Sequence, residues 1–195
     1  MSSDLLMRTL EHLRHLVAFD TRNPPRSIGT GGIFDYLRAN LPGFTCTVTD
    51  HGAGAVSLLA TRGNPAILFN VHLDTVPDAP GWTQNPLELQ IRADKAIGLG
   101  ACDIKGAAAA LLAAAEVTQG NAAFLFSTDE EANDARCIAA FLGSGHGFRD
   151  VIVSEPTNCQ AVLAHRGIAS AQVSFSGTSG HASTLVDPMQ SAVHQ

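Results

Sequence analysis

Four short motifs of the sequence bring together acidic side chains and one histidine. They are H-L-D-T-V-P from residue 72, G-L-G-A-C-D from residue 98, T-D-E-E from residue 128 and S-E-P-T from residue 154. Imidazole and carboxylate groups form a donor set that suits zinc, cobalt or manganese better than copper(I) or an iron–sulfur cluster. The chemistry that these residues predict is therefore metal-assisted.

Four of these residues are candidate metal ligands, and two others are candidate helpers. Three carboxylates at one edge of a sheet would repel one another, and a pair of divalent ions would remove that repulsion. Asp74, two residues after the histidine, is placed to accept the second ring N–H and fix the tautomer. Glu130 stands beside a candidate ligand and could take a proton from an attacking water. The candidate ligands are His72, Asp103, Glu131 and Glu155.

Each motif also has a purely structural explanation. Asp103 could cap the helix that follows it, residues 129–131 could complement the dipole of the next helix, and Glu155 before a proline is an ordinary strand end. These explanations do not account for the coincidence of the motifs at successive strand ends. Rival chemistries lack their signatures, because the sequence has no G-x-S-x-G elbow, no P-loop and only two glycines of a dinucleotide fingerprint.

Hydrophobic patterning predicts the elements that must position these residues. Short apolar runs at 66–71, 122–126 and 151–153 are typical of strands buried on both faces of a parallel sheet, with helices at 104–118 and 133–142 between them. This order predicts an α/β fold, with a mostly parallel central sheet, flanking helices and a site at the carboxyl ends of the strands. Further elements are expected at both ends of the chain: a helix after Ser2–Ser3 that ends before Asn23-Pro24, a helix at 33–41, paired strands at 44–48 and 55–61, and a strand at 168–175.

Composition narrows the possible partners and compartment. The 195 residues are 45% apolar and 15% charged, with a net charge of −6, which excludes a disordered chain and argues against nucleic acid or an anionic membrane as partner. The four cysteines form no C-x-x-C pair, and the first 19 residues lack the apolar centre of a signal peptide. A cytoplasmic protein with a small-molecule substrate is expected.

The four motifs, in this order and at these spacings, closely resemble the co-catalytic zinc aminoacylase and metallopeptidase family. That family includes acetylornithine deacetylases, succinyl-diaminopimelate desuccinylases and glutamate-releasing carboxypeptidases. The resemblance implies that Asp103 bridges two zinc or cobalt ions, that His72 and Glu155 complete one site, and that Glu131 ligates the other ion with Glu130 as general base. The segment 19–24 is similar to the acetylornithine and N-acetylcitrulline deacetylase branch. Removal of acetyl from N-acetylornithine or N-acetylcitrulline in arginine biosynthesis is thus expected, with desuccinylase, dipeptidase or carboxypeptidase activity as alternatives.

The resemblance also implies a division into domains. Residues 1–167 would be the metal-binding catalytic domain, and residues 168–195 would begin an α+β lid or dimerisation domain that is cut short. His181 would reach the active site of a partner subunit in a homodimer and stabilise the oxyanion. The family's second metal site also takes a histidine from beyond the lid, so a truncated, inactive metal-binding domain is the non-enzymatic alternative.

Overall fold

The computed structural model describes residues 2–25, 28–164, 166–167, 169 and 171–178. The chain divides into two units, Met1–Cys159 and Gln160–Gln195. The described residues of the second unit form no helix or strand, so the strand expected at 168–175 is wrong for the described part of that range. Its alternating pattern satisfies only one requirement of a strand, because a strand also needs a pairing partner. Assignment of residues 1–167 and 168–195 to two domains stays a prediction.

A five-stranded sheet organises the first unit, with strand order β1-β2-β6-β3-β7. β3 (Ile67–His72) runs parallel to both β6 (Ala122–Ser127) and β7 (Asp150–Val153). β1 (Thr45–Asp50) and β2 (Val56–Arg62) form the expected pair, which is antiparallel, and β2 also runs antiparallel to β6. The α/β fold with a central sheet is confirmed, but the sheet is mixed rather than mostly parallel, because β2 pairs antiparallel with both β1 and β6. A separate hairpin joins β4 (Gln90–Arg92) and β5 (Lys95–Ile97).

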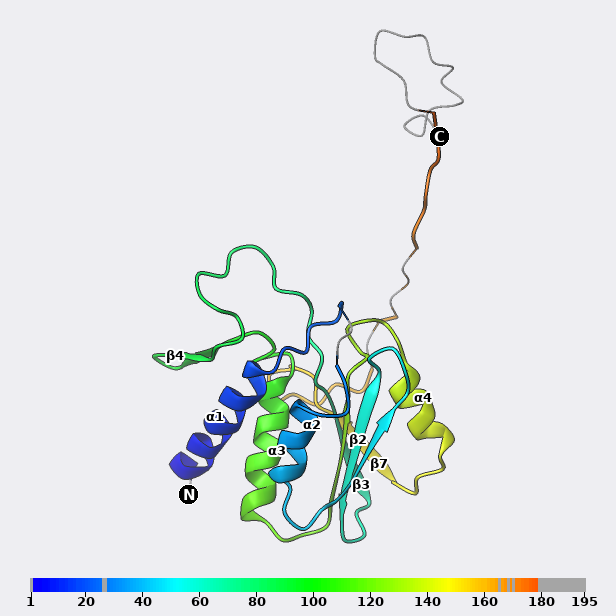
Figure 1. Cartoon of the computed structure of the whole chain (residues 1–195). Coiled ribbons are helices and arrows are strands. Elements are labelled where there is room, and N and C mark those ends of the chain that lie inside the picture. Colours follow the sequence, from blue (N-terminus) through cyan, green and yellow to red (C-terminus); the bar gives the residue numbers. More distant parts are fainter. Residues whose placement is uncertain (1, 26–27, 165, 168, 170, 179–195) are drawn as a thin grey trace. The chain divides into compact units, whose positions relative to one another are not determined.

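Helices flank the sheet, as expected (Figure 1). α1 (Ser2–Ala18), α2 (Ile33–Ala39) and α3 (Lys105–Val117) lie on one face, and α4 (Arg136–Gly143) lies on the other. α4 begins three residues later than predicted, because the buried Asp129 carboxylate accepts the Cys137 N–H at 2.9 Å and the chain turns between them. Among the described residues, no helix combines the length and apolar character needed to cross a membrane.

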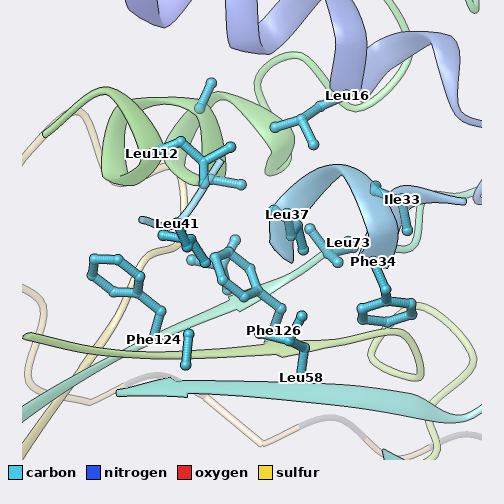
Figure 2. Close-up of a cluster of buried hydrophobic side chains, with 14 of the residues drawn as sticks. Leu16, Ile33, Phe34, Leu37, Leu41, Leu58, Leu73, Leu112, Phe124 and Phe126 are labelled. Carbon is cyan, nitrogen blue, oxygen red and sulfur yellow. The ribbon is translucent and has the colours of Figure 1, made fainter. Parts of the chain in front are cut away.

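β6 carries the core on both of its faces. Phe124 and Phe126 pack with side chains of the three-helix face, including Leu37 and Leu112 (Figure 2). Ala123 and Leu125 belong to a second cluster with Leu68, against which Ile138, Phe141 and Phe148 pack. Because close packing on both faces leaves little freedom for β6 and its neighbour β3, the loops that leave their carboxyl ends start from rigid positions.

β7 differs from the prediction of a strand buried on both faces. It lies at the end of the strand order, with β3 as its neighbour in the sheet, and Val151, Ile152 and Val153 are 52%, 46% and 57% exposed. An apolar run predicts a strand but does not reveal whether that strand lies at the centre or the edge of a sheet, since edge position is set by long-range pairing.

Lys105, the first residue of α3, is buried among the elements that carry the core. Its side chain is 0% exposed, and Nζ donates a hydrogen bond to the Phe19 carbonyl at 2.9 Å. Burial lowers the pKa of Lys105 to about 7, against a smaller opposing effect of Asp20. A lysine in the unfolded chain keeps a pKa near 10.4, so above pH 7 the unfolded state binds more protons at this residue than the folded state.

Lys105 should therefore make the free energy of unfolding rise with pH. The Lys105→Met variant has no titrating group at this position. Relative to it, the free energy of unfolding of the parent should rise by up to about 1.4 kcal/mol per pH unit between pH 7 and 9. Urea unfolding of both proteins in metal-free buffer at pH 7, 8 and 9 measures this difference, in which the ionisation of shared groups cancels. A constant difference across that range would contradict the burial of a titrating amine.

Candidate metal centre

The parallel strands bring three of the four motifs to one edge of the sheet. His72 ends β3 and pairs with Ser127 at the end of β6, and Asn70 pairs with Val153 at the end of β7. The chain then enters residues 73–76, 128–131 and 154–157, which contain the acidic residues. Because these strands point the same way, the three loops leave the sheet at the same edge.

The fourth motif reaches this edge through a tight loop before α3. Gly100 has a φ of 75°, and a Cβ at this position would lie 2.6 Å from Thr75 Cγ2. The Lys105 N–H donates to the Gly100 carbonyl at 2.8 Å, which closes the loop. Glycine thus permits both the left-handed turn and the close approach of the Asp103 loop to the segment after His72.

His72, Asp103 and Glu131 come together as the sequence predicts. One donor atom from each lies within 4.8 Å of the others. His72 Nε2 is 3.1 Å from Asp103 Oδ1 and 3.9 Å from Glu155 Oε1, so the fourth predicted ligand also borders the imidazole. Asp103 is not the N-cap residue of α3, which is Ile104. The structural explanation of Asp103 as a helix cap is therefore wrong.

Asp74 fixes the His72 ring from the opposite side. The Asp74 carbonyl oxygen lies 3.0 Å from His72 Nδ1, and its carboxylate Oδ1 lies 3.5 Å from the same nitrogen. A carbonyl oxygen can only accept, so Nδ1 carries the hydrogen and Nε2 is the nitrogen that faces the acids. Asp74 is 0% exposed, and its Oδ1 is a buried oxygen without a hydrogen-bond partner among the described residues.

The electrostatics of the cluster favour a bound cation. Burial opposes protonation of His72, but Asp74 and Glu155 outweigh it and raise the pKa of His72 to about 9. Burial also raises the pKa of Glu131 and of Glu155; His72 works against this, and Asp103 and Glu130 add to it by repulsion. Crowded, partly desolvated carboxylates around one ring nitrogen gain most from a positive charge placed among them.

The residues present fit a divalent metal ion. Nitrogen and oxygen donors converge on one point, and the ring nitrogen facing that point is the one that the Asp74 carbonyl does not contact. The buried Asp74 carboxylate, whose Oδ1 lies 3.5 Å from His72 Nδ1 without a hydrogen bond, can balance added positive charge. These donors are imidazole and carboxylate groups, as zinc and cobalt accept. The cluster is therefore a candidate metal centre.

The other predicted site residues differ in where they lie. Glu130 is exposed next to Glu131 and is close enough to raise the pKa of Glu131 and Glu155 by repulsion. His181 lies outside the described residues. Asp129, between β6 and these two glutamates, is buried, and its carboxylate accepts the N–H of Cys137 in the first turn of α4.

Asn23 also reaches the site, and the sequence pattern did not identify it. Asn23-Pro24-Pro25 predicts the end of the first helix, yet the Asn23 side chain is 1% exposed and donates to Asp74 Oδ2 at 3.2 Å. The two prolines that end the helix do not explain why the Asn23 side-chain amide is buried. The one available signal was the resemblance of segment 19–24 to a branch of the family.

Comparison with known proteins identifies relatives in the family that the four motifs resemble. An N-acetyl-L-citrulline deacetylase of Xanthomonas campestris pv. campestris is 64% identical over 194 residues, which are 99% of this chain and 53% of that protein. A succinyl-diaminopimelate desuccinylase of Caulobacter sp. (strain K31) is 33% identical over 179 residues, 82% of this chain and 46% of that protein. The chain thus spans about half the length of these curated relatives.

A solved structure and a family match extend the comparison. Human carnosine dipeptidase 1 superposes with a TM-score of 0.60 at 21% identity, over 75% of this chain and 38% of that one, which supports the fold. Residues 68–194 match the peptidase family M20/M25/M40, and this range contains all four motifs. The resemblance drawn from the motifs is confirmed: the chain belongs to peptidase family M20/M25/M40.

Proposed function

We propose that this chain is part of a metal-dependent amide hydrolase that removes the acetyl group from an N-acetylated amino acid. The observation that carries the proposal is the convergence of His72, Asp103 and Glu131 donor atoms within 4.8 Å. The 64% identity to an N-acetyl-L-citrulline deacetylase supports N-acetylcitrulline as substrate, with N-acetylornithine as the closely related choice. The reaction would belong to arginine biosynthesis in the cytoplasm.

Two zinc or cobalt ions would be held by the strand-end residues. His72 and Glu155 would bind one ion, Glu131 would bind the other, and Asp103 would bridge the two. When bound, such ions supply Lewis acidity, which polarises an acyl carbonyl and makes water a nucleophile near neutral pH. Asp74 keeps the His72 ring in the tautomer that presents Nε2 to an ion.

Glu130 is the proposed general base. Its side chain is exposed at the site, so it can accept a proton from the attacking water and return it to the departing amine. Its neighbour Glu131 has its N–H engaged by Asp74 Oδ2 at 3.0 Å, which anchors the loop on which both glutamates lie. Glu131 would thus bind metal, while Glu130 beside it would transfer protons.

The remaining elements of the proposed enzyme lie outside the described residues. His181 would act across a homodimer on the oxyanion that develops at the acetyl carbonyl. The histidine that completes the Glu131 site would come from the part of the relatives' length that this chain does not span. Both assignments follow the family resemblance.

Substrate preference tests the proposed function. The protein that carries this chain, loaded with zinc or cobalt, should release acetate from N-acetyl-L-citrulline or N-acetyl-L-ornithine at a kcat/KM at least about tenfold above its hydrolysis of N-succinyl-diaminopimelate or short dipeptides, since poor complementarity to a substrate group costs about that much. Preference for the succinyl substrate or a dipeptide would replace the proposal with the corresponding activity.

Replacement of Glu130 tests its role in proton transfer. Glu130→Gln should lower kcat by roughly 10²–10⁴-fold while metal content and melting temperature stay near those of the parent, because a general base is lost without loss of a ligand. Glu11→Gln, which removes an equal charge from an exposed position on α1, is the matched control and should keep full activity. A Glu130→Gln protein within about tenfold of the parent kcat would show that another group takes the proton.

A further inference from the structure

A short segment after α1 runs alongside the residues that follow β3. The Thr75 N–H donates to the Thr21 carbonyl at 3.0 Å, and the Asn23 N–H donates to the Thr75 carbonyl at 2.8 Å. Thr21 Oγ1 also donates to the Leu73 carbonyl at 2.7 Å. Hydrogen bonds on both sides of Asp74 therefore fix its backbone to residues 21–23.

The side chain of Asn23 continues this connection to the Asp74 carboxylate itself. Its amide Nδ2 donates to Asp74 Oδ2 at 3.2 Å and to the Thr128 carbonyl at 3.1 Å. The same Asp74 Oδ2 accepts the Glu131 N–H at 3.0 Å. One buried carboxylate oxygen thus joins the segment after α1 to the loop that carries Glu130 and Glu131.

The neutrality of the Asn23 amide matters as much as its position. A lysine or arginine here would form an ion pair with Asp74 and compete with His72 for its negative charge. An asparagine amide supplies two N–H donors and no net charge. It gives buried Asp74 Oδ2 a second donor beside the Glu131 N–H, donates to the Thr128 carbonyl, and leaves the carboxylate charge to act on the His72 ring.

We propose that Asn23 is a positioning residue of the metal centre. It holds Asp74 in place and, through Asp74, sets both the ring of His72 and the backbone of Glu131. The inference rests on the proposed metal site, which Asn23 reaches through Asp74 and through the Thr128 carbonyl. Two candidate ligands, His72 at the end of β3 and Glu131 in the loop after β6, are thereby tied to one amide that lies about fifty residues before the first of them in the chain.

Two variants and one matched control separate positioning from general stability. Asn23→Asp keeps the shape but places a second carboxyl group against Asp74, and Asn23→Ala removes the side chain. The control, Asn40→Asp, makes the same change at the end of α2, where Nδ2 donates to the Tyr36 carbonyl at 2.8 Å. Asn40 precedes β1, which starts at the sheet edge opposite the site, since Thr45 pairs with Thr61 and Thr61 with Ala123.

Two measurements on the 195-residue chain give the readout. Cobalt(II) titration followed by visible absorption reports metal affinity and ligand geometry, and hydrogen exchange of the Glu131 amide in metal-free protein reports its bond to Asp74. Both Asn23 variants should weaken cobalt binding roughly 10–100-fold, alter the absorption spectrum and accelerate Glu131 exchange beyond any change in global unfolding. Asn40→Asp should lower stability without these effects.

The outcomes are distinguishable. If an Asn23 variant that folds binds cobalt with the parent's affinity and spectrum and leaves Glu131 exchange unchanged, Asn23 has only a structural role and the inference is wrong. If Asn23→Asp does not fold, Asn23→Ala decides by the same criteria. If the parent binds no cobalt but Glu131 exchange still accelerates in the variants, Asn23 positions the loop as inferred, and the proposed metal function is what fails.

Discussion

The approach of carboxylates to His72 Nε2 is the interaction around which this part of the protein is arranged. Asp103 and Glu155 oxygens lie 3.1 and 3.9 Å from that nitrogen, and Glu131 joins the same cluster. Burial raises the pKa of Glu131 and Glu155, and repulsion from neighbouring carboxylates raises it further. The fold therefore holds together groups that would separate in free solution, and a metal ion is the partner that would stabilise them.

Buried contacts next to the site hold His72 and the clustered carboxylates together. β3 and β6 are fixed by core packing, Gly100 brings the Asp103 loop against Thr75, and the segment after α1 is hydrogen-bonded along residues 73–75. Lys105 ties the start of α3 to the Phe19 carbonyl at the end of α1. The segment after α1 thus contributes through hydrogen bonds to the position of candidate ligands that lie far from it in sequence.

The sequence predicts those features that local patterns determine. The apolar runs that became β3 and β6, the helices on both sides of the sheet, and the convergence of His72, Asp103 and Glu131 follow from periodicity, motif order and the common direction of parallel strands. Local patterns do not predict features that depend on contacts between distant parts of the chain. The exposed edge position of β7 depends on strand order, and the burial of Asn23 against Asp74 depends on contacts fifty-one residues apart. Glu155, two residues after the end of β7, lies 3.9 Å from His72 Nε2, and its role as a ligand stays a prediction.

Location of the bound metal tests the central claim most directly. Crystals of the zinc- or cobalt-loaded protein, measured on both sides of the metal absorption edge, should show an anomalous peak about 2.0–2.2 Å from His72 Nε2 and from an Asp103 carboxylate oxygen. A metal peak at another site, or no peak at His72 in protein saturated with zinc or cobalt, would contradict the account.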